Sequence, residues 1–289
     1  MSQGKKIATR ESYGRTLAEL GKEHEDFLVL DADLAGSTKT AVFRKAFPER
    51  HINCGIAEQN MIGVAAGIAA TGRVAFASSF AMFAAGRAYE QIRNSVGYPQ
   101  LNVKIAATHG GISVGEDGAT HQCNEDFALM RTIPGMVVMV PSDDVEAAAM
   151  VRAAYEHKGP VYMRFSRLAT PVFNNPETYK FEIGKAITMR EGKDVAIIAA
   201  GLPVASAMEA AEKLAAEGIE ARVIDMHTIK PLDEAAVLRA AKEIGKIVTV
   251  EEHSVIGGLG SAVAEVLAEQ CPAKLKRVGV YDRYTESGP

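Results

Sequence analysis

The stretch that decides the fold is residues 54–67, which read CGIAEQNMIGVAAG. A short polar turn opens a helix of small residues, and Glu58 stands in its first turn. A carboxylate often occupies this position only because the free N–H groups and the helix dipole favour negative charge there. Residues 74–77 then form a predicted buried strand, and the aromatic residues Phe80 and Phe83 follow it. An acid beside backbone lined by glycine and alanine, with aromatic rings nearby, predicts a pocket for a flat heterocycle.

Strands and helices alternate along the first half of the sequence. Short apolar runs predict strands at residues 27–30, 51–53, 74–77, 103–107, 136–140 and 161–163. Helical spacing predicts helices at residues 9–21, 38–47, 80–96, 124–131 and 145–157, besides the one that begins near Glu58. Thr9 and Ser142 are expected to cap two of these helices, and Gly21 to end the first. This alternation is typical of an α/β fold with helices on both faces of a mostly parallel sheet.

Residues suited to chemistry follow several of the predicted strands. Asp33, Glu58, Phe80 and His109 each stand after a different strand. Ligands of parallel sheets bind outside the carboxyl ends of the strands. We therefore expect these side chains to lie along one edge of the sheet and to form a site there.

A second α/β unit follows a break in the periodic pattern. Residues 168–183 include Pro171 and the turn Asn174-Asn175-Pro176 but few periodic positions, which indicates a linker. We assign the larger domain to residues 1–170, the linker to residues 171–184 and a smaller α/β domain to residues 185–289. In this domain we predict strands at 194–199, 221–225, 247–250 and 277–280, and helices at 201–218, 233–244 and 259–269.

Two motifs of the second domain invite a functional interpretation that their spacing does not support. Residues 257–260 read GGLG, without the lysine and hydroxyl of a phosphate loop or the spacing of a dinucleotide fingerprint, so a tight turn is expected. Glu251, Glu252 and His253 contain metal-ligand residue types. Adjacent residues of a strand point to opposite faces, so a solvated or interface cluster is expected instead.

The loop of residues 108–121, which reads THGGISVGEDGATH, is the second candidate centre. Long glycine-rich loops with histidines and acids are commonly functional. His109, Asp117 and His121 could exchange protons with hydroxyls and carbonyl oxygens during carbon–carbon bond cleavage. The same three residues could instead hold a metal ion, although residue types alone indicate such a site only weakly.

Composition narrows the class of protein. With 47% hydrophobic and 24% charged residues over 289 positions, the chain is that of a globular protein without an apolar run long enough to span a membrane. A net charge of −4 argues against attraction to nucleic acid or to anionic membrane. The three cysteines match no zinc or redox spacing, and the first six residues lack the apolar run of a signal peptide, so we expect a cytoplasmic protein.

Residues 55–59, the segment around Phe80 and the loop from His109 to His121 resemble the pyrimidine-binding half of transketolases. The resemblance covers essentially the whole chain, is most specific at residues 115–122, and is to the split form in which the two halves are separate chains. It implies that Glu58 activates thiamine diphosphate. It also implies that Phe80, with Phe83 as second candidate, stacks on the pyrimidine ring; a plain core role is the alternative for Phe80.

The resemblance also implies roles for the residues that meet the substrate. Asp117 and His121 are expected to contact the hydroxyl and carbonyl end of the sugar, and His109 to lie at the acceptor entrance. A second set resembles sugar-phosphate contacts, and a fork of guanidinium groups suits a phosphate dianion. This set comprises Arg10, Ser37 and Arg167. Asp33 resembles a residue near the cofactor, although it could equally cap the helix that begins near residue 38.

The diphosphate-and-magnesium motif of thiamine enzymes, Gly-Asp-Gly followed later by Asn, does not occur in this sequence. The resemblance therefore implies a separate N-terminal subunit that binds the diphosphate and ligates Mg²⁺, and an α2β2 assembly; no metal ligands are assigned to this chain. The low charge of residues 62–70 suits burial at such an interface. The last six residues form no closing helix, so the natural product is expected to be longer.

The function that these residues favour is ketol transfer. We expect a thiamine-diphosphate-dependent transketolase subunit that moves a two-carbon ketol unit between ketose and aldose phosphates. The alternatives are the β subunit of a 2-oxoacid dehydrogenase, part of a deoxyxylulose phosphate synthase, or a non-catalytic transketolase-like binding protein. Residues 115–121 favour transketolase over the first two, and the set Glu58, His109, Asp117 and His121 argues against the last.

Overall fold

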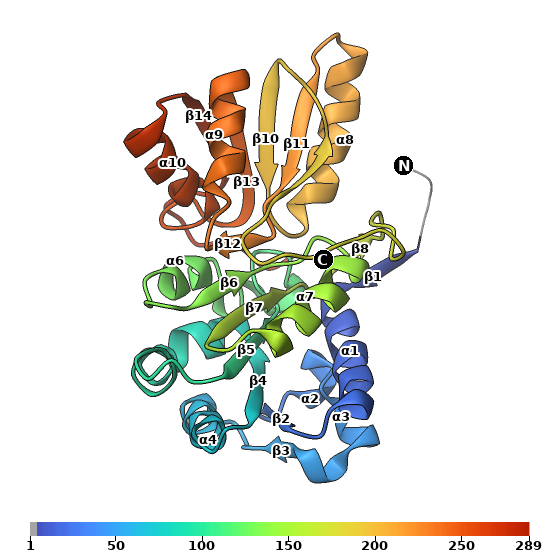
Figure 1. The fold of residues 1–289 in the computed structure, drawn as a ribbon, viewed down its shortest axis with the longest axis vertical. Helices are drawn as coiled ribbons and strands as arrows, with labels where there is room; N and C mark the ends of the chain where they lie inside the picture. Colours follow the sequence, from blue (N-terminus) through green and yellow to red (C-terminus); the bar gives the residue numbers. More distant parts are fainter. Residues whose placement is uncertain (1–4, 289) are drawn as a thin grey trace.

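A seven-stranded sheet forms the centre of the N-terminal domain (Figure 1). The computed structural model describes residues 5–288, so the outermost residues of the two predicted domains, 1–4 and 289, lie outside it. The strands are β2 (Phe27–Asp31), β3 (His51–Asn53), β4 (Val74–Phe80), β5 (Val103–Thr108), β6 (Val137–Met139), β7 (Val161–Phe165) and β12 (Thr228–Lys230). Their order is β12-β6-β7-β5-β4-β2-β3, and only β12 runs antiparallel to its neighbour. The predicted mostly parallel sheet is confirmed.

Helices cover both faces of this sheet, as predicted. One face packs against α1 (Thr9–Glu23), α3 (Ala41–Ala46) and α7 (Asp144–Glu156), whose apolar side chains form one buried core with those of the strands. The other face packs against α4 (Glu58–Ala70), α6 (Asp126–Arg131) and the segment between β4 and β5. The strand residues alternate between these two cores because successive side chains of a strand point to opposite faces.

Helix α1 differs from its prediction at both ends. Thr9 does not cap the helix, because it is already the first helical residue and its hydroxyl lies 2.9 Å from that of Ser166. Gly21 does not end the helix, which continues to Glu23. A Cβ at position 21 would lie 2.4 Å from the ring of Phe47, so glycine allows the helix to approach that ring closely.

The start of α7 also differs by one residue from its prediction. Asp143, not Ser142, caps the helix, and its Oδ1 accepts a hydrogen bond of 2.9 Å from the amide of Glu146. The hydroxyl of Ser142 instead donates to the Glu146 carboxylate at 2.7 Å. Both residue types are good caps, so the sequence pattern could not distinguish them.

Two predicted helices are interrupted. Lys39, with a left-handed φ of +70°, separates α2 (Ala35–Thr38) from α3, so the helix predicted at residues 38–47 is shortened to Ala41–Ala46. Residues 80–96 do not form one regular α-helix either. They comprise the end of β4, two π-helical segments at Met82–Arg87 and Ile92–Gly97, and α5 (Tyr89–Gln91).

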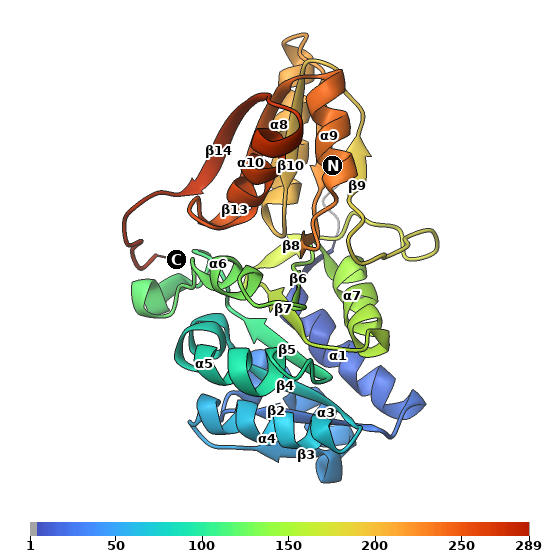
Figure 2. The same ribbon diagram turned by 60° about the vertical axis from the view of Figure 1, so that its left-hand side comes forward.

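The C-terminal domain is built on a five-stranded sheet and is stacked on one end of the N-terminal domain (Figures 1 and 2). The sheet has the order β14-β13-β10-β11-β9, with only β9 antiparallel. Its strands are β9 (Ile187–Arg190), β10 (Val195–Ala199), β11 (Ala221–Asp225), β13 (Lys246–Ser254) and β14 (Lys274–Val280). Its helices are α8 (Pro203–Ala216), α9 (Glu234–Glu243) and α10 (Leu259–Gln270).

The glycine-rich turn before α10 is a strand-to-helix connection, as predicted. The carboxylate of Glu251 accepts hydrogen bonds of 2.7 and 2.8 Å from the amides of Leu259 and Gly260. Glu251 therefore occupies the position at this helix start that a phosphate would take. His253 is buried as well, and its ring stacks on Phe127 of the N-terminal domain with centroids 5.0 Å apart. The polar residues 251–253 thus contribute to the contact between the domains.

Two strand pairings tie distant parts of the chain together in ways that the sequence did not indicate. Strand β12, at residues 228–230, leaves the C-terminal domain and joins the edge of the N-terminal sheet beside β6. Strand β1 (Lys6–Ala8) pairs with β8 (Ala169–Pro171), which enters the predicted linker. Both pairings join segments separated by many residues, so only the folded chain brings them together.

A buried group of carboxyl side chains lies where α7 meets β11. Asp225, at the end of β11, is fully buried and its two oxygens have no hydrogen-bond partner of standard geometry. Burial raises the pKa of Asp225 well above its ordinary value, and the negative charge of nearby Glu146 raises it further. Burial also raises the pKa of Glu146 to about 7, although Ser142 and Tyr179 donate hydrogen bonds to it. The folded chain therefore holds protons here that the unfolded chain releases.

This group predicts that Asp225→Asn stabilises the protein increasingly as the pH rises from 5 to 8. The folded pKa of Asp225 is raised, so its contribution to stability is complete below about pH 4, the ordinary aspartate pKa, and is lost as the pH rises. The loss is at most about 1.4 kcal/mol per pH unit. Melting temperatures measured at pH 5, 6, 7 and 8 would test this. The exposed Asp282→Asn is the control, and an Asp225→Asn effect independent of pH would contradict the prediction.

Candidate functional site

Glu58 lies at the carboxyl edge of the N-terminal sheet as the first residue of α4. Its side chain is 1% exposed, so the carboxylate is buried at a helix start, where the peptide dipoles stabilise negative charge. Its Oε2 accepts a hydrogen bond of 2.8 Å from Arg87, whose side chain is half exposed. Its Oε1 accepts only a long contact of 3.5 Å from the hydroxyl of Ser79. Oε2 is thus held by Arg87, and Oε1 remains able to accept a hydrogen bond from a ligand.

A cluster of aromatic rings lies beside this carboxylate. The rings of Phe80 and His109 stack with centroids 3.9 Å apart, and Phe83 lies parallel to Phe80 at 5.9 Å. The rings of His121 and Phe83 are edge-to-face with centroids 5.3 Å apart, and the Arg87 guanidinium lies 4.6 Å from the centre of the Phe83 ring. The structure therefore brings the predicted residues from β4, the loop after β5 and α4 together at one edge of the sheet.

The two phenylalanines of the cluster differ in accessibility. Phe80 is 7% exposed, and His109 covers one face of its ring. Phe83, from the π-helical segment, is only half-buried. Phe83 therefore offers the more accessible ring face of the two.

His109 follows β5 with a left-handed φ of +60° and is held from both sides of its ring. Its Nε2 lies 3.2 Å from Nη1 of Arg10, and its Nδ1 lies 2.9 Å from the hydroxyl of Thr108. Because arginine can only donate, Nε2 accepts and Nδ1 carries the proton. Burial is the main cause that lowers the pKa of His109 to about 3, and the positive charges of Arg10, Arg167 and other cations lower it as well. His109 is therefore neutral at pH 7.

Cationic side chains converge on the neighbourhood of His109. Arg10 from α1 donates to the backbone oxygen of Ser37 at 2.9 Å, so the contact of Ser37 is through its main chain. Burial and then Arg167 lower the pKa of Arg10, which shows that the two guanidinium groups repel each other. Lys39 also acts on His109 through its charge. Such a group of cations, only weakly balanced by acids, is suited to bind an anion.

The loop that carries Asp117 and His121 projects toward the same edge. Asp117 lies in the short helical segment Gly115–Thr120, is exposed, and its carboxylate has no partner among the described residues. His121 is half-buried, and its Nδ1 lies 2.9 Å from the hydroxyl of Thr120. Within residues 5–288, no three His, Cys, Asp or Glu side chains form an arrangement that could hold a metal ion. The metal interpretation of His109, Asp117 and His121 thus gains no support.

Asp33 lies at the same edge, after β2, but caps no helix. It has a left-handed φ of +62° and is exposed. The amide of Asn53 donates to its carboxylate at 2.9 Å, and the oxygen of Asn53 accepts from the backbone of Asp33 and of Gly55. Leu34, not Asp33, precedes α2. Asn53 therefore joins the ends of β2 and β3 to the turn before Glu58.

Three residues of this site were not predicted from the sequence: Arg87, Lys39 and Asn53. Arg87 stands directly after the glycine that follows the Phe80 segment, so an extension of that motif by one residue would have included it. Lys39 and Asn53 carry no sequence signal of their own. Their roles depend on neighbours that are distant in the chain.

Comparison with known proteins defines the class to which this fold and site belong. The family description "Transketolase, pyrimidine binding domain" matches residues 5–172, and "Transketolase, C-terminal domain" matches residues 184–289. The chain belongs to the transketolase family, which confirms the resemblance read from its motifs. Among the described residues no helix is long and apolar enough to cross a membrane.

Similar proteins include subunits and sections of transketolases. A putative transketolase C-terminal section from Methanocaldococcus jannaschii is 54% identical over 96% of this chain and 88% of its own length. A 6-deoxy-6-sulfo-D-fructose transketolase subunit from Clostridium sp. is 46% identical over 96% and 86%. The solved structure of a split-gene transketolase, an inactive β4 tetramer, is 56% identical with a TM-score of 0.89, covering 96% of this chain and 89% of that one.

Proposed function

We propose that the chain is the pyrimidine-binding subunit of a split transketolase that transfers a two-carbon ketol unit between ketose and aldose phosphates. The observation that carries this proposal is the buried Glu58 carboxylate at the start of α4, beside an accessible aromatic ring. The relatives named as a C-terminal section and as a subunit support it, since they match this chain over nearly its whole length.

The geometry around Glu58 fits the pyrimidine ring of thiamine diphosphate, which supplies the nucleophilic carbon that attacks a ketose carbonyl. Oε1 of Glu58 is the oxygen left to accept a hydrogen bond from a ring N–H, because Arg87 holds Oε2. Phe83, with Phe80 behind it, offers a ring face for stacking. Asp33 would contribute to the same pocket, since Asn53 joins its carboxylate to the turn before Glu58.

The residues of the loop and of α1 would bind the sugar. His109 is neutral at pH 7, so we assign it hydrogen bonding at the acceptor entrance rather than the role of a charged acid. Asp117 and His121 would bind the hydroxyl and carbonyl end. Arg10 and Arg167, with the Ser37 backbone beside them, would bind the phosphate. One relative is named a subunit of a 6-deoxy-6-sulfo-D-fructose transketolase, and the sulfo group of that sugar is an anion like the phosphate proposed here.

The proposal includes a separate N-terminal subunit that binds the diphosphate through Mg²⁺, and self-association into an α2β2 assembly in the cytoplasm. The β4 tetramer of the 56% identical relative, which is inactive, supports both the self-association and the need for a second chain. The cysteines Cys54, Cys123 and Cys271 are free thiols in the structure, in keeping with a reducing compartment.

This proposal predicts that the purified chain alone has no transketolase activity, and that activity appears when a diphosphate-binding transketolase subunit, thiamine diphosphate and Mg²⁺ are added. Ketol transfer from a ketose phosphate to an aldose phosphate is the measurement. Parallel assays with a 2-oxoacid as donor test the dehydrogenase and deoxyxylulose phosphate synthase alternatives. Robust activity of the chain alone, shown free of partner, would overturn the split-subunit proposal, and inactivity of the complete mixture with every donor would favour a non-catalytic protein.

A further inference from the structure

The loop of residues 112–122, which carries Asp117 and His121, contains one short helical segment, Gly115–Thr120. Besides the bonds within that segment, its backbone bonds run from Val114 to Ile112 and from His121 and Gln122 to Gly118. Gly118 has a left-handed φ of +66° and interrupts the helical segment in which Asp117 lies. Asp117 itself is exposed. Because Gly118 breaks the segment between Asp117 and His121, contacts from outside the loop contribute to where these two side chains point.

Gln122 connects the C-terminal end of this loop to a distant part of the chain. Its side chain is 5% exposed, and both its amide nitrogen and its oxygen form hydrogen bonds. Nε2 donates to the backbone oxygen of Ile112 at 3.0 Å and to that of Glu286 at 3.1 Å. The hydroxyl of Thr285 donates to Oε1. Gln122 thus ties the two ends of the loop to each other and to the segment after β14.

The segment Thr285–Gly288 lies directly on the loop. The amide of Gly288 lies 3.4 Å from the backbone oxygen of Gly115. A Cβ on Gly118 would lie only 2.1 Å from the hydroxyl oxygen of Ser287, so a glycine at this position permits the contact. In Figure 2 the chain descends from β14 to the junction of the two domains, where its C-terminal end lies near this loop.

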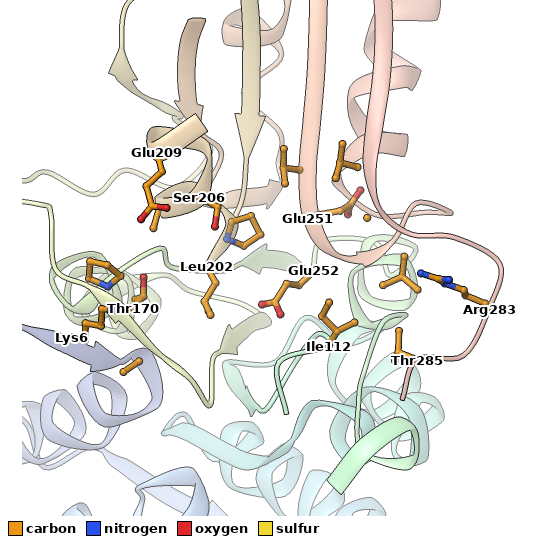
Figure 3. Close-up of a pocket in the computed structure, with 18 residues that line it drawn as sticks. Lys6, Ile112, Thr170, Leu202, Ser206, Glu209, Glu251, Glu252, Arg283 and Thr285 are labelled. Atoms are coloured by element: carbon orange, nitrogen blue, oxygen red, sulfur yellow. The ribbon is translucent and has the colours of Figure 1, made fainter. Parts of the chain in front are cut away.

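The N-terminal end of the loop is held by the C-terminal domain as well. Oε1 of Glu252, from β13, accepts a hydrogen bond of 3.1 Å from the amide of Ser113. Figure 3 shows Glu252, Ile112 and Thr285 around a cavity of about 550 Å³ between the domains. Because a cavity and not a packed core adjoins Ile112, hydrogen bonds rather than close packing fix this end of the loop.

We propose that Gln122 and the segment Thr285–Gly288 form a clamp that positions Asp117 and His121 for the ketol transfer proposed above. Gln122 is a positioning residue: its side chain hydrogen-bonds to Ile112, Glu286 and Thr285, and it acts through the loop. The C-terminal domain thereby contributes to the site through Glu252 and through the segment after β14.

The test compares Gln122→Ala and the milder Thr285→Val with wild type in two measurements. The first is hydrogen exchange of the Ser113, His121 and Gln122 amides in the full chain without substrate. We expect exchange to rise about tenfold in Gln122→Ala, as loss of one well-made hydrogen bond would cause, with a smaller rise in Thr285→Val. Amides of β4 and β5 should not change. This measurement needs no activity, so it tests the clamp even if the proposed function fails.

The second measurement is kcat in the complex with the diphosphate-binding subunit. We expect kcat to fall about tenfold in Gln122→Ala while the affinity for thiamine diphosphate stays at the wild-type value, since Glu58 is untouched. Gln100→Ala is the matched control, because Gln100 also donates to two backbone oxygens, those of Gly97 and Pro134, away from the loop. Unchanged exchange in both variants, or an equal loss of kcat in Gln100→Ala, would overturn the clamp. If Gln122→Ala does not fold, Thr285→Val decides.

Discussion

Replacing Glu58 by glutamine is expected to lower kcat of the assembled complex by about 10²–10⁴-fold, the range for loss of a positioned acid–base group. Glutamine has the same shape, and its side-chain oxygen can still accept the hydrogen bond of Arg87. The atom that replaces Oε1 is an amide nitrogen, which donates hydrogen bonds. It can therefore no longer accept a hydrogen bond from the ring N–H of the cofactor. Folding and cofactor affinity should therefore change little while turnover collapses. The measurements are kcat with a ketose phosphate donor and the dissociation constant of thiamine diphosphate.

Glu265→Gln is the matched control for this variant. Glu265 also pairs with an arginine, since Nη2 of Arg131 lies 2.6 Å from its carboxylate, but it is exposed and lies on α10, away from the site. We expect its kcat to stay within about twofold of wild type, as is usual for surface substitutions. Near-normal turnover of Glu58→Gln would remove Glu58 from its proposed role. An equal loss in both variants would indicate a defect of assembly instead.

The N-terminal sheet could be predicted because its strands are buried on both faces and are separated by helices, a pattern that local sequence records. Strand β12 could not be predicted in the same way. It is three residues long, comes from the second domain and pairs with a strand some ninety positions earlier. Nothing in residues 228–230 specifies that partner, because the pairing depends on how the two domains pack.

The site divides in a similar manner. Glu58, Phe80 and His109 could be located because each follows a strand, and the topology of a parallel sheet places such residues at one edge. The pairing of Arg87 with Glu58 depends on the π-helical segment, whose irregular turn no helical periodicity reveals. The neutral state of His109 depends on burial and on cations that distant segments contribute. Long-range geometry, not residue type, thus determines which predicted residues carry charge.

The second large effect concerns the anionic end of the substrate. We expect Arg10→Ala and Arg167→Ala each to lower kcat/KM for a ketose phosphate by roughly ten- to a hundredfold, the equivalent of about 1.5–3 kcal/mol for a hydrogen bond to a charged group. Arg10 and Arg167 repel each other in the structure, and a phosphate dianion between them would relieve that repulsion. The present partner of Arg167 is the exposed Glu116 at 3.3 Å, a weak surface pair that a phosphate could replace.

The unphosphorylated ketose separates recognition of the phosphate from carbon–carbon chemistry. Its kcat/KM should be nearly unaffected in both variants, because neither guanidinium has an anion to bind and Glu58 remains intact. Arg15→Ala supplies the control, since Arg15 lies on the same helix as Arg10 but pairs with Asp144 at 2.7 Å and is half exposed. Equal losses with the phosphorylated and the unphosphorylated donor would show that Arg10 and Arg167 act structurally, as in the contact of Arg10 with His109. Selective loss with the phosphorylated donor would place the phosphate beside His109. The sugar chain would then extend from the phosphate toward Glu58.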